Sequence, residues 1–168
     1  MTVLLENQRQ ARKARLVMLG TIVWSIGWLY WSYVLAQSFG LAPGDGGSLR
    51  PANQRYAISA LALVVAIAPV VGMIVYGRVY LMRLERDGDA LALTTLGFLF
   101  PHTFLVRLSD LTGSTTYDDD KPGVSLAEAP WITLRVKGYR LPFIVDLQAE
   151  HVNAGAIRAL IRRKKKDD

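Results

Sequence analysis

The sequence predicts a membrane protein in which a hairpin of two transmembrane helices is followed by a small α+β domain, an antiparallel sheet with a C-terminal helix. Two observations predict this class. Two 22-residue segments, 16–37 and 56–77, contain no Asp, Glu, Lys or Arg. Because an α-helix rises about 1.5 Å per residue, each segment can span roughly 33 Å, enough for a hydrocarbon core of about 30 Å. After residue 87, apolar and polar residues alternate with the period of β-strands.

The composition allows one small domain outside a membrane. The chain has 168 residues, of which 51% are hydrophobic, and its net charge is +6. It has no cysteine, which excludes disulfides, thiol catalysis and thiolate metal sites. The basic residues cluster at the ends of the apolar segments and in the tail, a pattern that indicates membrane orientation and anionic lipid. We therefore expect anionic membrane lipid, with cardiolipin as one candidate, as a partner, and no nucleic acid.

The first transmembrane helix, 16–37, follows a basic N-terminal arm, residues 1–15, which we expect to extend it as a short helix. The apolar segment is too long for a signal peptide and no small-x-small cleavage motif follows it, so we expect it to remain in the mature protein. Trp24, Trp28 and Trp31 recur at i, i+4 and i+7, on one face. This ridge either packs on the second helix and lipid tails or forms a docking face for a membrane partner.

The second transmembrane helix, 56–80, follows a turn-rich loop, 38–55. Small residues recur along it at four-residue spacing, Ala62 with Ala66 and Ala68 with Gly72, which lets helices approach closely. No ionisable residue lies in either apolar segment, which disfavours an ion or solute pathway. The arm and the segment after the second helix are more basic than the loop. Both ends of the chain should therefore face the positive side, cytoplasm or mitochondrial matrix.

The domain at 87–161 should contain at least four strands and a final helix. The alternation predicts strands near residues 90–94, 103–108, 131–137 and 141–145, and an apolar face predicts a helix from about Asn153 to Lys164. Asn153, or Asp146 further back, is the candidate cap of this helix. Between the second and third strands, the polar segment 112–130 should be an irregular loop. Its acidic run, Asp118–Asp120, lacks the spacing of a calcium-binding loop and is more typical of a solvated segment.

The tail, 162–168, is basic and then acidic. We expect its cations either to be solvated or to attract anionic head groups, each contributing about 1 kcal/mol near a membrane surface. They are Arg162, Arg163, Lys164, Lys165 and Lys166.

Motifs for catalysis are absent from the sequence. It contains no glycine-rich phosphate loop, no paired histidines at helical spacing and no nucleophile elbow. Its two histidines, His102 and His151, lie far apart in sequence without an evident orienting partner. We therefore expect no catalytic residue, no cofactor, no metal site and no enzymatic activity.

Three short motifs carry a resemblance to known families. They are Leu-Thr-Thr at 93–95, Val-Arg-Leu-Ser at 106–109 and the hairpin Leu-Arg-Val-Lys-Gly-Tyr-Arg at 134–140. With the two spans, they resemble bacterial membrane proteins bearing a pleckstrin-homology-like (PH-like) domain and, more closely, the mitochondrial family of transmembrane protein 223. That family has a Leu-Thr-Thr strand, a Val-x-Leu-Ser strand and a late Lys-Val-Lys-Gly-x-x hairpin. The resemblance covers most of the chain, although segment 112–130 is longer here.

The resemblance implies a PH-like domain on an integral protein of the mitochondrial inner membrane, with both ends in the matrix and a role in the biogenesis of cytochrome c oxidase. It carries over no catalytic residue. We therefore expect a non-enzymatic accessory subunit or assembly factor of a respiratory complex. Two alternatives remain: a PH-like membrane module that binds anionic lipid, and a subunit of another inner-membrane complex such as ATP synthase.

Overall fold

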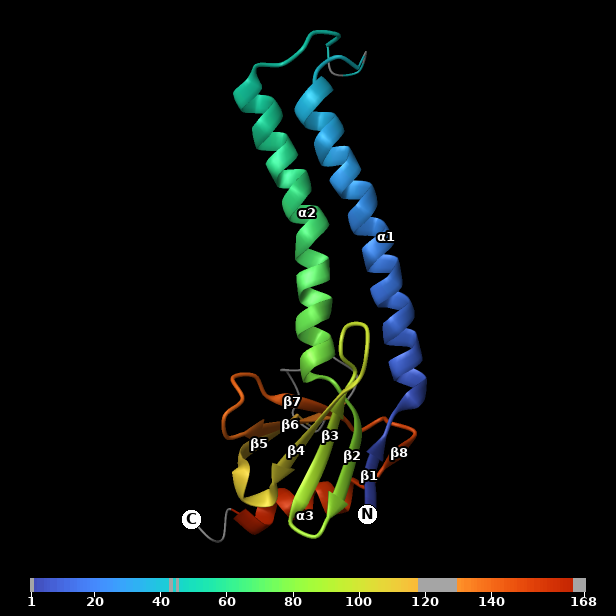
Figure 1. Ribbon diagram of the computed structural model, residues 1–168, viewed down its shortest axis with the longest axis vertical. Helices are drawn as coiled ribbons and strands as arrows, with labels where there is room; N and C mark the ends of the chain where they lie inside the picture. Colours follow the sequence, from blue (N-terminus) through green and yellow to red (C-terminus); the bar gives the residue numbers. More distant parts are fainter. Residues whose placement is uncertain (1, 43, 45, 118–129, 165–168) are drawn as a thin grey trace. The chain divides into compact units, whose positions relative to one another are not determined.

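The computed structural model describes residues 2–42, 44, 46–117 and 130–164 (Figure 1). The chain forms two compact units. One is a helix-pair unit, Leu16–Ile74, and the other is a sheet unit made of Met1–Arg15 together with Val75–Asp168. The sheet unit therefore takes residues from both sides of the helix pair in the sequence.

Two helices are long and apolar enough to cross a membrane, as predicted. They are α1, Gln8–Ser38, and α2, Ala52–Val79. The basic arm forms the first two turns of α1. The helix begins where the side-chain oxygen of Asn7 accepts a hydrogen bond from Gln10 N at 3.3 Å, which satisfies one of the free amides of the first turn. It ends just before Gly40, which adopts a left-handed φ of 100° as many residues after helix ends do.

The sheet unit contains two antiparallel sheets and a C-terminal helix. The first sheet has the order β4-β3-β2-β1-β8 and the second has the order β5-β6-β7. The four predicted strands are present as β3, β4, β6 and β7. The bounds are β1 Thr2–Glu6, β2 Leu81–Asp87, β3 Ala90–Thr95, β4 His102–Arg107, a short 3-10 turn η2 Leu108–Asp110, β5 Leu111–Tyr117, β6 Trp131–Val136, β7 Phe143–Asp146, β8 His151–Val152 and α3 Ala154–Lys164.

The N-terminal arm contributes a strand that the sequence analysis did not predict. β1 lies between β2 and β8 and pairs antiparallel with both, with Glu6 opposite Arg83 in β2. Asn7 N then donates to Met82 O at 2.9 Å, which extends the pairing to the start of α1. Helix α1, the loop and α2 are therefore an insertion in the connection between two paired strands (Figure 1).

The sheet domain also starts earlier than residue 87, where we predicted it. β2 begins at Leu81, directly after α2, and its exposed face carries Arg83 and Glu85, an ion pair at 2.8 Å. These charges make the segment resemble the basic flank of a transmembrane helix. β5 consists of Leu111 and the first residues of segment 112–130, which we predicted to be irregular. It is a strand because its backbone pairs with β6, not because its residues alternate. Residues Asp118–Asp120 lie outside the described part of the chain.

The core of the sheet unit lies between the two sheets and α3. Asn153 Oδ1 accepts a hydrogen bond from Ala156 N at 3.0 Å and caps α3, as predicted. The helix contacts β1 and β5, and Ile157 and Leu160 are buried. Both sheets contribute to the same apolar cluster, whose largest fully buried members include Leu5, Leu81, Leu84, Leu91, Leu93, Ile132 and Val145.

Candidate functional site

The seam between α1 and α2 consists of small and hydroxyl-bearing residues. Ser25 Oγ donates to Ala66 O at 2.7 Å. About two helical turns further along α1, the hydroxyl of Ser59 donates to Ser32 O at 2.8 Å. Ala66 is buried at the first of these contacts and Ala62 is buried between the two, as their predicted role in close helix approach requires. The two hydrogen bonds fix an antiparallel register within the helix-pair unit. Each of these hydroxyls donates to a backbone carbonyl. None of these serines therefore pays the free-energy cost of an unpaired polar group.

Gly72 does not belong to this seam, although the sequence analysis grouped it with Ala62 and Ala66. It is exposed, and a Cβ added to it would meet no atom within 4 Å. The residues that face α1 recur with alternating spacings of three and four, as Ser59, Ala62 and Ala66 do, and Gly72 falls out of that phase. A four-residue spacing of small residues alone therefore did not identify the face that packs.

The tryptophan ridge borders the seam and faces outward from it. Trp24 is 55% exposed and Trp31 is 52% exposed, whereas Trp28 is partly buried. The rings of Trp24 and Trp28 lie 5.7 Å apart, tilted by 50°, so that they stabilise one another without filling the helix–helix contact. Ser25 and Ser32 follow Trp24 and Trp31 directly in sequence, which places these two rings beside the seam. The ridge is an apolar surface that the helix pair itself leaves uncovered.

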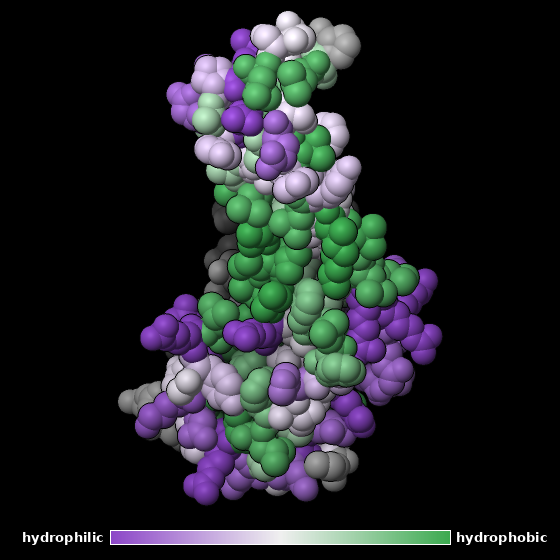
Figure 2. All heavy atoms as spheres, turned by 45° about the horizontal axis from the view of Figure 1, so that its top comes forward, coloured by the Kyte–Doolittle hydropathy of each residue, from purple (hydrophilic) through white to green (hydrophobic). Residues whose placement is uncertain are grey.

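Most of the surface of the helix pair is apolar and exposed. Only 17% of the most apolar 18-residue window of α1 and 11% of that of α2 are buried, whereas the core helix of a soluble domain would be mostly buried. Figure 2 shows hydrophobic side chains gathered over the middle of the two helices. The exposed residues include Leu19, Val23, Ile26, Leu61, Val64 and Val71.

A buried polar cluster, Asn7, Tyr80 and Asp146, joins the ends of both helices to the second sheet within the sheet unit. The side-chain amide of Asn7 donates to Tyr80 Oη at 2.8 Å and to Asp146 Oδ2 at 3.3 Å. Tyr80 Oη donates to the same carboxylate oxygen at 3.0 Å. Asn7 lies just before α1, Tyr80 just after α2, and Asp146 at the end of β7. We call this set the polar junction.

The chemistry of the polar junction is that of a structural contact. Burial, and secondly the charge of Asp146, raise the pKa of Tyr80 well above its usual range, so that its hydroxyl stays protonated and donates. The other carboxylate oxygen of Asp146 accepts from Gln148 N at 2.8 Å. The carboxylate is therefore held by donors from three parts of the chain. The sequence does not predict this cluster, because residues 7, 80 and 146 are far apart in the chain and share no local sequence pattern.

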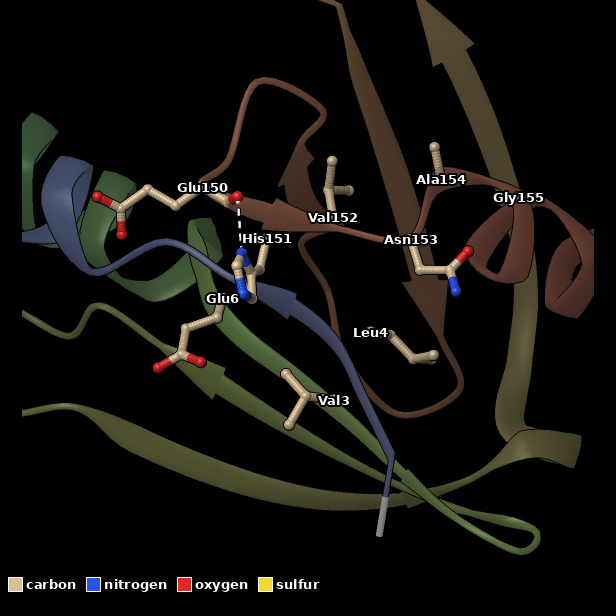
Figure 3. Close-up of a pocket in the computed structure, with 9 residues that line it drawn as sticks. All are labelled: Val3, Leu4, Glu6, Glu150, His151, Val152, Asn153, Ala154 and Gly155. Carbon is tan, nitrogen blue, oxygen red and sulfur yellow. Dashed lines mark hydrogen bonds between the residues drawn. The ribbon is translucent and has the colours of Figure 1, made fainter.

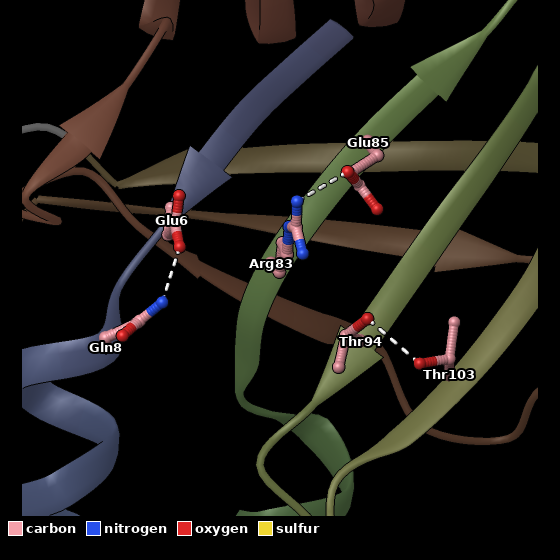
Figure 4. A network of polar contacts seen from close by, with 6 residues as sticks. All are labelled: Glu6, Gln8, Arg83, Glu85, Thr94 and Thr103. Carbon is pink, nitrogen blue, oxygen red and sulfur yellow. Dashed lines mark hydrogen bonds and ion pairs between the residues drawn. The ribbon is translucent and has the colours of Figure 1, made fainter. Parts of the chain in front are cut away.

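A pocket beside β1, β8 and the start of α3 contains His151 (Figure 3). His151 lies opposite Glu6 in the strand pairing, and its Nδ1 lies 2.9 Å from Glu150 O. Glu6 instead accepts from Gln8 Nε2 at 2.6 Å (Figure 4). The carboxylates of Glu6 and Glu150 point in different directions (Figure 3). Within the described ranges, no group of three His, Asp or Glu residues is placed to hold a metal ion.

The two histidines lie on opposite edges of the first sheet. His102 is in β4 and His151 is in β8, the outermost strands in the order β4-β3-β2-β1-β8. The ring of His102 stacks on Phe104 with centroids 5.9 Å apart. The fold therefore keeps the two histidines apart, which agrees with their separation in sequence.

The predicted basic tail is described only in part. Helix α3 continues through Arg162, Arg163 and Lys164, but the placement of their side chains is not described, and Lys165 and Lys166 lie outside the described residues. Other described cations lie in the two helix ends that belong to the sheet unit, on the flanks of the apolar segments. Arg9, Arg12, Lys13, Arg15 and Arg78 are all exposed there.

Comparison of the chain with protein-family profiles, with curated proteins and with solved structures finds no match.

Proposed function

We propose that this protein is an integral membrane protein whose helices α1 and α2 cross the bilayer and carry a PH-like sheet domain. The observation that supports this most strongly is the apolar surface of the helix pair, of which only a small share is buried, on two 22-residue segments without a charged side chain. Exposed apolar surface of this extent is costly in water and normal in lipid. The succession of two antiparallel sheets and a C-terminal helix is compatible with the PH-like expectation.

In this proposal both ends of the chain lie on the same side of the membrane. The pairing of β1 with β2 supports it, because a strand before α1 can pair with a strand after α2 only on one side. Arg9, Arg12, Lys13 and Arg15 in α1 and Arg78 in α2 favour the positive side, the cytoplasm or the mitochondrial matrix. The loop between the helices then faces the opposite side.

We further propose a non-enzymatic role as accessory subunit or assembly factor of a respiratory complex in the mitochondrial inner membrane, with cytochrome c oxidase favoured. The motifs at 93–95, 106–109 and 134–140 support this through their resemblance to the transmembrane protein 223 family. The exposed rings of Trp24 and Trp31 offer other integral subunits a rigid apolar contact, and tryptophan is enriched at such contacts.

The test is extraction of native membranes in mild detergent, separation by size, and quantitative mass spectrometry of every fraction that contains this chain. Migration with a mature respiratory complex at about one copy each identifies an accessory subunit. Migration with sub-complexes identifies an assembly factor, and co-migration with ATP synthase identifies that alternative. Absence from all respiratory complexes contradicts the proposal.

The second candidate function is binding of anionic lipid, and the exposed cations at the helix ends favour it. Five of them lie close to the ends of the charge-free segments, where they would meet lipid head groups. Retention of cardiolipin by the purified protein should then fall as salt is raised and when these cations are changed to glutamine. Removal of the tail cations Arg162–Lys166 tests separately the contribution predicted from the sequence. If cardiolipin retention is unaffected by higher salt, by the glutamine substitutions and by removal of the tail cations, this function is excluded.

A further inference from the structure

The connection between β3 and β4 has an apolar tip. The segment Gly97–Pro101 reads Gly-Phe-Leu-Phe-Pro, and the side chains of Leu99 and Phe100 are 64% and 77% exposed. Two adjacent large apolar side chains at the end of a surface hairpin, without cover from the rest of the sheet unit, are unusual for a solvated turn. In the sequence, Gly97 and Pro101 predict only a turn at this place.

The base of this tip is held in one conformation. Leu96 N donates to Tyr80 O at 3.0 Å, and Gly97 N donates to Gly77 O at 2.7 Å. Gly97 has a φ of 64°, and a Cβ at this position would overlap the carbonyl oxygen of Phe100. The tip therefore projects from a fixed turn that is bonded to the last residues of α2.

The strand register places this tip on the side of the sheet where α2 ends. β2 leads away from α2, and β3 returns along it, with Thr95 opposite Leu81. The chain after Thr95 thus continues beyond the end of strand β3 toward the end of α2 (Figure 1). Gly77, which accepts the bond from Gly97, is the last residue of the charge-free segment, and exposed Arg78 follows it. The base of the tip therefore lies at the level where α2 would leave the hydrocarbon.

We propose, on the basis of the membrane-spanning function proposed above, that the Gly97–Pro101 tip is a third element of this chain that enters the bilayer. Leu99 and Phe100 lie at the boundary between head groups and acyl chains, the depth at which apolar faces of interfacial elements are buried. The charged residues around the tip also favour a lipid environment. Arg78 beside the base, and the cations of the first turns of α1 in the same unit, complement anionic head groups.

The absence of cysteine from the chain makes a direct test possible. Three single-cysteine variants of the full chain, F100C, L105C and V64C, are placed in nanodiscs of phosphatidylcholine and cardiolipin, and their reaction with a membrane-impermeant maleimide is timed. Leu105, on β4, is as exposed as Phe100, at 77%, and is the matched control. Val64 lies in the middle of α2 and reports whether the helix is in lipid. Circular dichroism checks that each variant is folded.

We expect F100C to react at least about tenfold more slowly than L105C, because Leu99 remains in this variant and its burial in lipid favours the buried state of the tip by that factor or more. A fluorophore on F100C should also be quenched by a lipid with a nitroxide near the head group. Equal reaction of F100C and L105C, with V64C protected, overturns the inference while the membrane span stands. Protection of F100C without quenching shows a protein cover and also overturns it. A reactive V64C instead refutes the proposed membrane span, and with it this inference.

Discussion

Glu6, the last residue of β1, lies opposite Arg83 of β2, although both long helices separate them in the sequence. This pairing makes the helix hairpin an insertion between adjacent strands, so that the two helices leave the sheet unit at neighbouring points. The polar junction reinforces it, because Asn7 and Tyr80 bind the same carboxylate oxygen of Asp146. The start of α1 and the end of α2 are thus fixed by the same few residues.

Replacing Asn7 with alanine should destabilise the sheet unit by about 2–4 kcal/mol, since the change removes a helix cap and a buried donor to a carboxylate. The measurement is urea unfolding in mild detergent, followed by intrinsic fluorescence. Gln8→Ala is the matched control: Gln8 is exposed and bonds only locally to Glu6, so its change should stay within about 0.5 kcal/mol. Equal effects of the two substitutions would show that the polar junction is not structural.

The stability of the protein should fall as pH rises above about 10, the usual pKa of tyrosine. The folded protein raises the pKa of Tyr80, so that the unfolded chain loses this proton first and unfolding becomes more favourable with rising pH. Tyr80→Phe should be less stable than the parent below pH 10, by about 1–3 kcal/mol, and should show a weaker decline above it. Parallel unfolding curves at several pH values measure both effects. A decline of the same slope in the variant would assign the titration to other groups.

Ala66→Leu should destabilise the helix pair by about 1–3 kcal/mol, because Ala66 is fully buried where Ser25 Oγ meets its carbonyl. Gly72→Leu should cost nothing, since Gly72 is exposed and a Cβ at this position meets no atom within 4 Å. Thermal unfolding in lipid nanodiscs, followed by circular dichroism, compares the two variants. If Gly72→Leu lost as much stability as Ala66→Leu, a different face of α2 would pack against α1.

Changing Trp24 and Trp31 together to alanine should weaken association with a membrane partner, while the helix pair remains folded. Both rings are exposed beside the seam, and a tryptophan at the centre of an interface contributes about 2 kcal/mol or more. The readout is the fraction of the chain that co-migrates with a respiratory complex after mild extraction. Tyr30→Ala changes an equally exposed aromatic residue about a third of a turn away and is expected to leave co-migration unchanged. If the double variant co-migrates as the parent does, the ridge is a lipid contact.

The sequence by itself determined the elements that depend on local patterns. The two long helices follow from uninterrupted apolar segments, and β3, β4, β6 and β7 follow from period-two alternation. The cap of α3 follows from Asn153, because capping involves only residues three positions apart. In each case the interactions that form the element lie within a few residues of it.

Only the tertiary structure decided which further segments are strands and which faces pack. β1 and β5 lack alternation and β2 is charged. Each becomes a strand through backbone bonds to a partner whose position in sequence gives no local signal. The polar junction depends in the same way on residues 7, 80 and 146 converging in space. Ala66 and Gly72 show the limit for helices: both are small residues on α2, but the register set by Ser25 and Ser32 buries one and exposes the other.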